Sequence, residues 1–199
     1  MLGASLEDPT QGVVLPPRSY LVLRPLTDDE VELCRSFARR DISATREPAA
    51  WALSEASARC SELPSIRVGD IDVLEGSVFI AGGAKTASRY GELSDWGLVQ
   101  VKRRLRALKA KDPEALLLGA ATRNRASARA SAYDAIRATL DRAGLGHEPD
   151  VRPNSVVAWR GASALASGAS IDEVARMLGM RSLDAAASFI GWRWQGEES

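Results

Sequence analysis

Residues 56–72 read ASARCSELPSIRVGDID, and this stretch decides the fold that the sequence predicts. We expect an alanine-rich apolar helix that carries Arg59 near its C-terminal end and breaks at Pro64, with a short strand after it. A buried arginine is costly unless it is paired or held ready for an anion. Glu62 lies one helical turn beyond Arg59, so we expect its carboxylate to orient the guanidinium.

The composition is typical of one folded domain of ordinary size. The chain has 199 residues, of which 45% are hydrophobic and 26% are charged, which is enough for one core and marginal for two. No apolar run approaches the roughly 18 residues of a membrane span, and the first residues lack a basic-then-apolar signal pattern. We therefore expect a cytoplasmic protein with no membrane partner.

The cysteines and the histidine predict no metal site. Cys34 and Cys60 both fall among apolar residues of predicted helices, without the spacing of metal ligands, which is typical of buried thiols. His147 is the only histidine and lies in a predicted loop, where such a side chain is usually solvated. We expect no metal, no cofactor and no small-molecule substrate.

The charge of the chain is balanced, with 26 basic and 26 acidic residues and a net charge of zero. Neutralising DNA phosphates requires an excess of lysine and arginine on one face. The balance therefore argues against strong nonspecific DNA binding, although basic residues gather at 102–111 and 123–129. A solvated helix face is the simpler interpretation of the first group.

The hydrophobic pattern predicts a mainly α-helical domain with a small antiparallel β-sheet, an α+β fold. Residues 1–25 contain several prolines and no helical period, so we expect an extended arm or linker; residues 26–194 form the domain, and residues 195–199 are a short acidic tail. The helices expected from apolar spacing and capping residues span 27–40, 47–63, 95–110, 128–140, 154–167, 170–178 and 185–190. The strands expected from β-type runs span 66–68, 72–74 and 77–80, with a return strand after Lys85.

Residues 56–72 resemble the first signature box of the tyrosine recombinases, or phage integrases, in which a small-residue helix, an arginine, Ser-Glu-Leu and an Asp-Ile-Asp turn follow in this order. The resemblance implies the fold of the integrase (DNA breaking-rejoining) catalytic domain and DNA as the partner. In that family the arginine clamps the scissile phosphate, and Arg59 is the matching position. A hairpin lysine that enters the DNA minor groove is matched by Lys85. Residues 8–16 are similar to the connector of the family, which implies that the N-terminal helical half is not part of this chain.

The C-terminal part resembles the second signature region of the family. There His-x-x-Arg opens a helix, Leu-Gly-His follows a short second helix, and the nucleophilic tyrosine lies nine residues after the last histidine. Leu178-Gly179 fixes the register without gaps. In this register the family positions are occupied by Asn154, Val157, Met180 and Phe189.

These four changes predict that the chain does not cleave DNA, and no catalytic set is intact. Phe189 has no oxygen that could attack phosphorus. Val157 removes one guanidinium of the phosphate clamp, and losing one charge-stabilising contact of this kind costs about 10²–10³ in rate. Met180 can neither donate nor accept a strong hydrogen bond.

Our first hypothesis is a catalytically inactive, recombinase-like DNA-binding domain that is regulatory or accessory to DNA recombination or integration. It would bind DNA weakly when alone, and an active recombinase or another protein would be its partner. The expected phosphate contacts are the basic residues Arg59, Lys85, Arg89, Arg160 and Arg181.

Two alternatives remain open. A protein-interaction module on the same scaffold, without DNA binding, agrees with the zero net charge. An active recombinase would need a displaced nucleophile, for which the chain offers only Tyr20, Tyr90 and Tyr133.

Overall fold

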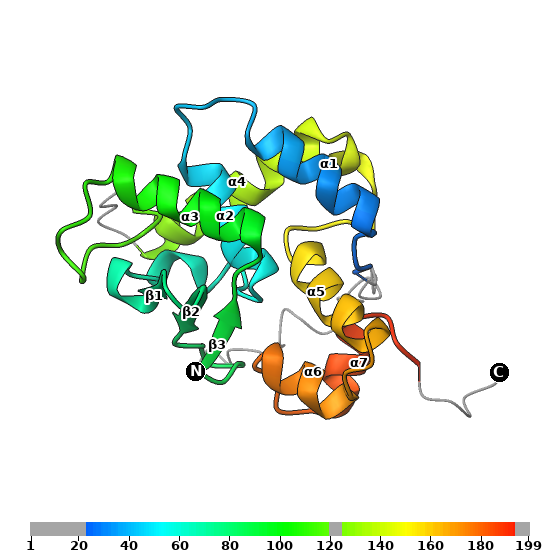
Figure 1. Cartoon of the computed structure of the whole chain (residues 1–199). Helices are drawn as coiled ribbons and strands as arrows, with labels where there is room; N and C mark the ends of the chain where they lie inside the picture. The colour runs from blue at the N-terminus through cyan, green and yellow to red at the C-terminus, as the bar shows by residue number, and fades with distance from the viewer. Residues whose placement is uncertain (1–22, 120–124, 194–199) are drawn as a thin grey trace, which may run out of the picture.

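A small sheet and seven α-helices make up the part of the chain that the computed structural model describes, residues 23–119 and 125–193 (Figure 1). The helices are α1 (Asp28–Ala38), α2 (Arg46–Glu55), α3 (Asp95–Ala107), α4 (Arg125–Arg142), α5 (Ser155–Ala166), α6 (Ile171–Met177) and α7 (Leu183–Phe189). The strands are β1 (Ile71–Asp72), β2 (Ser77–Ile80) and β3 (Arg89–Glu92), and three short 3-10 turns are η1 (Leu63–Ser65), η2 (Val68–Asp70) and η3 (Leu145–His147). The predicted fold class, mainly α with a small antiparallel sheet, is confirmed.

Helix α2 lies at the centre of the core: its residues 48–55 are all buried, and most of them are apolar. It packs against α1, α3, α4 and α5, and Trp51 and Leu53 are completely buried. A helix that is hydrophobic all round is stable only where other elements cover it. The buried Glu55 carboxylate at its end accepts hydrogen bonds from the Trp51 indole at 2.7 Å and from the Arg35 side chain of α1 at 2.8 Å.

The helix starts that the sequence predicts are present. Thr27 and Glu30 form the expected capping box at α1, with the Glu30 backbone N–H donating to Thr27 Oγ1 and the Thr27 N–H donating to the Glu30 carboxylate. Ser94 caps α3 by accepting from the Gly97 N–H at 3.1 Å. These caps fix where the chain enters each helix, and so fix the loops between them.

The sheet has the order β1-β2-β3, and each pair is antiparallel. Side chains alternate between its two faces: Val78 and Ile80 of β2 are buried, whereas Ser77 and Phe79 are only partly covered. Strand β3 lies directly over the end of α2. The contact is so close that a Cβ atom at Gly91 would lie 2.0 Å from the Ala56 carbonyl oxygen. Glycine is therefore required at that contact.

Three expected elements are wrong in detail. The strand expected at 72–74 is β1, Ile71–Asp72, because residues 73–76 form a turn. Helix α2 ends at Glu55, not near residue 63, because Ser57 takes a left-handed conformation with φ 78° and the chain turns. Residues 66–68 form no strand, since their backbone bonds go to a loop: the Val68 N–H donates to the Ala115 carbonyl at 2.9 Å. Arg59 therefore lies in a turn after the helix.

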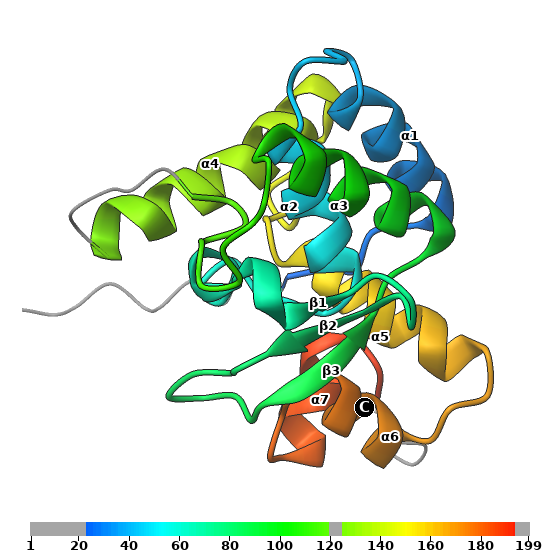
Figure 2. The ribbon, with the colours of Figure 1, turned by 60° about the vertical axis from the view of Figure 1, so that its left-hand side comes forward.

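Helices α5, α6 and α7 lie beside β3 and form the lower part of the domain in both views (Figures 1 and 2). The Ala87 N–H, before β3, donates to the Gly179 carbonyl between α6 and α7 at 2.9 Å. Both segments that this hydrogen bond joins carry expected site residues. Lys85 and Arg89 lie near Ala87, and Met180 and Arg181 follow Gly179.

Several expectations concern residues outside the described ranges. They are most of the arm at 1–25, Tyr20, the tail at 195–199 and the side chains of the basic group at 123–129. Within the described ranges, the α-helices are all too short or too polar to cross a membrane.

Candidate functional site

Arg59 presents two buried nitrogens that have no hydrogen-bond partner among the described residues. They are Nε and Nη2, among the few such side-chain atoms in the described residues, and they form the edge of a guanidinium that binds two oxygens of an oxyanion side by side. Burial lowers the pKa of Arg59, with Glu62 opposing that shift and the charge of Arg89 adding to it. Because arginine stays charged in proteins, the site holds an unsatisfied cation.

The Arg59 guanidinium lies over the ring of Phe189, a residue of α7. The Arg59 Cζ atom lies 4.9 Å from the centroid of the Phe189 ring, which is within the range of a cation–π contact. The ring offers no hydrogen-bond acceptor oxygen, so this contact leaves Nε and Nη2 without a partner among the described residues. The structure thus brings together two expected site residues that are far apart in the sequence.

Glu62 positions the Arg59 backbone, not its side chain as we expected. Its Oε2 atom accepts from the Arg59 backbone N–H at 2.9 Å, while its carboxylate forms an ion pair with Arg89 in which the oxygen and nitrogen are 2.7 Å apart. Burial would raise the pKa of Glu62, but hydrogen bonds from Arg89, Thr86 and the Arg59 backbone lower it below its usual range. The carboxylate therefore stays ionised.

Arg89 corrects a second expectation, because internal hydrogen bonds already occupy its guanidinium. Its side chain is only 5% exposed, and its Nε and Nη2 atoms donate to Ser57 Oγ at 3.1 Å and to the Ser57 carbonyl at 2.6 Å. Its Nη1 atom donates to Glu62 and to the Ala87 carbonyl. Arg89 is saturated by these internal bonds and holds the turn that carries Arg59.

The left-handed Ser57 is the strained residue that this network maintains. A serine with φ 78° costs on the order of 1–3 kcal/mol and persists only where the surroundings hold it. Two hydrogen bonds from Arg89, to the hydroxyl and to the carbonyl of Ser57, stabilise this conformation. The left-handed conformation of Ser57 turns the chain after α2, and the Arg59 side chain then contacts Phe189 of α7.

Lys85 lies at the tip of a tight turn between β2 and β3. The turn is closed by backbone bonds between Gly83 and Thr86, and Lys85 is exposed. Thr86 Oγ1 donates to Glu62 Oε1 at 2.5 Å. The same carboxylate therefore connects the Arg59 turn to the Lys85 turn.

The positions that the resemblance aligned with a second arginine and two histidines offer no further charge. Val157 is fully buried, and Met180 is partly buried against the core. Asn154, the N-cap residue of α5, accepts a weak hydrogen bond from the Cys60 N–H at 3.3 Å through Oδ1. Asn154 thus ties the start of α5 to the residue after Arg59.

Arg160 and Arg181 are exposed to different degrees. The Arg160 guanidinium donates to Glu92 at 3.0 Å and is 30% exposed. Arg181 is exposed and makes no hydrogen bond or ion pair within the described residues. Tyr90 and Tyr133 are exposed, on the outer face of the sheet and on α4 respectively.

The roles of Ser57, Thr86 and Arg89 were missed by sequence reasoning. A serine gives no signal of a left-handed backbone, and a buried arginine looks like any other arginine in a sequence. Cys34 is buried as expected, whereas Cys60 is only partly buried. Burial raises the pKa of each thiol to about 12. No cluster of metal-ligating side chains occurs within the described ranges.

The sequence matches no protein-family model and no curated protein. Its structure is similar to several solved structures. The XerA recombinase superposes with a TM-score of 0.71 at 21% identity, covering 88% of this chain and 61% of that one. A lambda integrase (75–356) dimer bound to a COC' core site gives 0.60 at 17% identity, covering 89% and 62%. The integrase from mycobacterium phage Brujita gives 0.61 at 18% identity, covering 96% and 67%.

These similarities establish the fold. The chain has the fold of the tyrosine recombinase catalytic domain, as residues 56–72 predicted. It spans between half and about three-fifths of the length of the first structures that it matches.

Proposed function

We propose that this chain is a DNA-binding domain of recombinase fold that does not cleave DNA and that is accessory to, or regulates, a DNA recombination or integration reaction. The single observation that carries the proposal is Arg59, whose Nε and Nη2 atoms have no hydrogen-bond partner among the described residues and which lies beside an aromatic ring that has no hydroxyl. Both atoms are covered in this structure, so a DNA phosphate would have to displace the groups over them. A phosphodiester supplies the two adjacent oxygens that these two atoms lack.

The remaining contacts would come from cations on the same side of the network. Lys85 lies on a turn that Glu62 connects to the Arg59 turn. Arg181 lies two residues after Gly179, whose carbonyl accepts a hydrogen bond from the Ala87 N–H. Arg160 could join only by leaving Glu92. So few phosphate contacts support weak binding with a shallow salt dependence, because the salt slope scales with the number of phosphates neutralised.

The solved structures of this fold agree with DNA as the partner. The lambda integrase dimer is bound to a COC' core site, and the XerH recombinase is bound to palindromic difH substrate. DNA binding is a property of those proteins. We extend it to this chain on the evidence of the Arg59 site.

The lack of cleavage follows from chemistry at three positions. Strand cleavage needs an oxygen nucleophile and guanidinium groups that stabilise the charge at phosphorus. Phe189, Val157 and Met180 supply neither. A domain that binds the DNA of a recombinase without cutting it fits an accessory or regulatory role.

A fluorescence anisotropy titration of labelled duplex DNA at about 50 mM salt tests the proposal, because electrostatic binding is strongest there. We expect Arg59→Gln to weaken binding about 10- to 100-fold, since a hydrogen bond to a charged group contributes about 1.5–3 kcal/mol. Arg67→Gln is the matched control: Arg67 is 50% exposed and pairs with Glu114 away from the site. The proposal fails if the wild-type protein does not bind, or if both variants lose the same affinity.

A protein-interaction module without DNA binding is the second candidate. The observation that favours it is the equal number of acidic and basic residues. It predicts that the Arg59→Gln and Lys85→Gln variants keep full activity in cells, which the DNA-binding proposal does not allow.

A further inference from the structure

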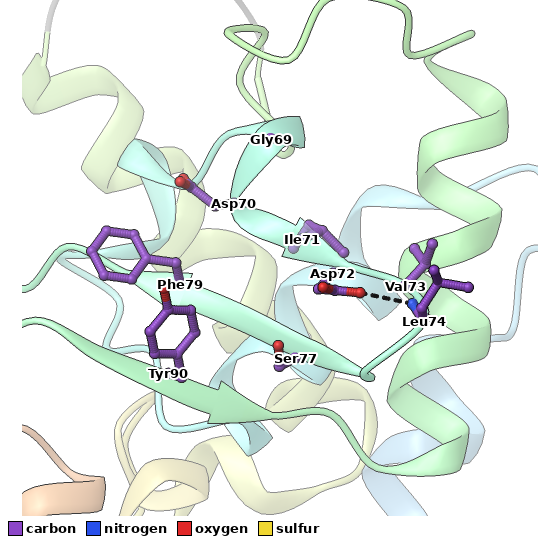
Figure 3. Close-up of a pocket in the computed structure, with 9 residues that line it drawn as sticks. All are labelled: Gly69, Asp70, Ile71, Asp72, Val73, Leu74, Ser77, Phe79 and Tyr90. Atoms are coloured by element: carbon purple, nitrogen blue, oxygen red, sulfur yellow. Dashed lines mark hydrogen bonds between the residues drawn. The ribbon is translucent and has the colours of Figure 1, made fainter.

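A groove of ≈ 570 Å³ lies on the outer face of the sheet (Figure 3). It is lined by residues 69–74 together with Ser77, Phe79 and Tyr90, and we call it the outer groove. Neighbouring residues of β3 point to opposite faces, so Arg89 is buried in the site network while Tyr90 faces the groove. The groove and the Arg59 site are therefore on opposite sides of one sheet.

One end of the outer groove is aromatic. The centroids of the Phe79 and Tyr90 rings lie 5.3 Å apart, with their planes at 53°, and both rings stand on the exposed side of the strands (Figure 3). Tyr90 is 74% exposed. The face of an aromatic ring carries negative charge and attracts cations, and it binds a planar guanidinium best by stacking.

Two carboxylates border the same groove. The Asp72 Oδ1 atom accepts from the Leu74 and Glu75 backbone N–H groups at 2.9 Å, and the Asp70 Oδ2 atom accepts from the Arg67 N–H at 2.7 Å. The other oxygen of each carboxylate has no hydrogen bond from the described residues. The backbone thus fixes two acidic groups whose charge no described cation neutralises.

The other end of the groove is apolar and fully accessible. Leu74 is 92% exposed, in a turn in which its N–H donates to Asp72. Figure 3 shows it at the opposite end of the groove from the aromatic pair, with Asp72 and Ser77 between. An extended segment lying along β2 would meet the aromatic pair, the acidic groups and the leucine within a few residues, since each residue spans about 3.3 Å.

We propose that the outer groove binds an extended segment of a partner protein that carries an arginine, with the guanidinium stacked on Phe79 and Tyr90 and paired with Asp70 or Asp72, and an apolar side chain against Leu74. Arginine fits better than lysine because its guanidinium both stacks on rings and pairs with carboxylates. Charge complementarity selects this occupant, because the carboxylates repel a DNA backbone. Both partners could bind at once, since DNA would contact the other face.

An NMR titration of the ¹⁵N-labelled full chain tests this inference. The probe is the tetrapeptide acetyl-leucyl-seryl-seryl-arginine amide, and the matched probe has citrulline in place of arginine, which keeps the shape and removes the charge. We expect the arginine peptide to shift the amide signals of Ser77, Phe79 and Tyr90 with a dissociation constant in the millimolar range. The citrulline peptide should cause much smaller shifts.

Two variants separate charge from structure. Asp72→Asn keeps the oxygen that accepts the turn hydrogen bonds and should weaken the arginine peptide about twofold to fivefold, the range of an exposed ion pair. Glu75→Gln changes the same charge outside the groove lining and should leave the affinity unchanged. The inference is overturned if the groove signals do not move, if citrulline binds as well as arginine, or if the same signals shift with duplex DNA or with protein concentration alone, which would identify DNA or a second copy as the occupant.

Discussion

The Arg59 guanidinium lies over the ring of Phe189, with 4.9 Å between its central carbon and the ring centroid. The resemblance to tyrosine recombinases places the nucleophilic tyrosine at position 189, and the structure puts that position against the arginine that the first signature box supplies. The alignment of the two signature regions is therefore geometrically consistent.

Phe189→Tyr alone should not restore DNA cleavage. The new hydroxyl would lie near Arg59, but Val157 and Met180 still supply neither a second guanidinium nor a proton donor, and each missing charge contact costs about 10²–10³ in rate. Trapping on a nicked suicide substrate, followed by denaturing electrophoresis, measures the covalent protein–DNA adduct. An active recombinase on its own site is the positive control, and an adduct formed by this single variant would show that the proposed loss of catalysis is wrong.

Much of the fold could be predicted because its signals are local. The capping box at Thr27, the serine cap of α3 and the glycine after α6 are short patterns with direct physical meaning, and each appears where it was expected. The signature residues around Arg59 also led to the correct fold.

The rest could not be predicted because it depends on contacts between distant segments. The end of α2 is set by a strained Ser57 that Arg89, 32 residues later, holds in place. The same contact buries Arg89, which we expected at the DNA surface. Charge alone in a sequence does not distinguish a cation that binds a ligand from one that supports the backbone.

Arg59→Met should stabilise the fold while weakening DNA binding. Arg59 has two buried nitrogens without partners among the described residues, and an apolar side chain of similar length removes the cost of burying such unsatisfied donors, about 1–3 kcal/mol. The lost cation–π contact opposes this gain by about 0.5–2 kcal/mol, so we expect a net increase of about 1 kcal/mol. Urea unfolding measures it, and a clear loss of stability would mean that Arg59 supports the fold.

Glu62→Gln should destabilise the domain by about 3–5 kcal/mol at pH 7, because it leaves the buried Arg89 without its counter-ion. The control is Glu114→Gln: Glu114 is 70% exposed and pairs with Arg67 at the surface, so its loss should cost under about 1 kcal/mol. Denaturant unfolding of the three proteins measures both. Equal effects of the two substitutions would contradict the central role of Glu62.

The same pair gives a pH dependence of known sign. The folded pKa of Glu62 lies below its usual value of 4.5, so its carboxylate contributes stability that is fully present above pH 4.5 and is lost as the pH falls through the lower, folded pKa. The difference in unfolding free energy between the wild-type protein and Glu62→Gln should therefore shrink below pH 4.5. A difference that stays constant to acid pH would exclude an ionised Glu62.

Gly179→Ala should disrupt the site more than a substitution at another left-handed glycine. Gly179 has φ +66°, and a Cβ atom there would lie 2.7 Å from Arg89 Nη1 and 2.8 Å from the Ala87 carbonyl oxygen. Gly168 has φ +99° with nothing within 4 Å of such an atom, so Gly168→Ala carries only the backbone cost, about 1–2 kcal/mol. Gly179→Ala adds a clash with the arginine that holds Ser57, and we expect it to cost at least about 1 kcal/mol more and to weaken DNA binding when folded. Urea unfolding and anisotropy measure the two effects, and equal stability of the two variants would mean that the close contact with Arg89 has no energetic consequence.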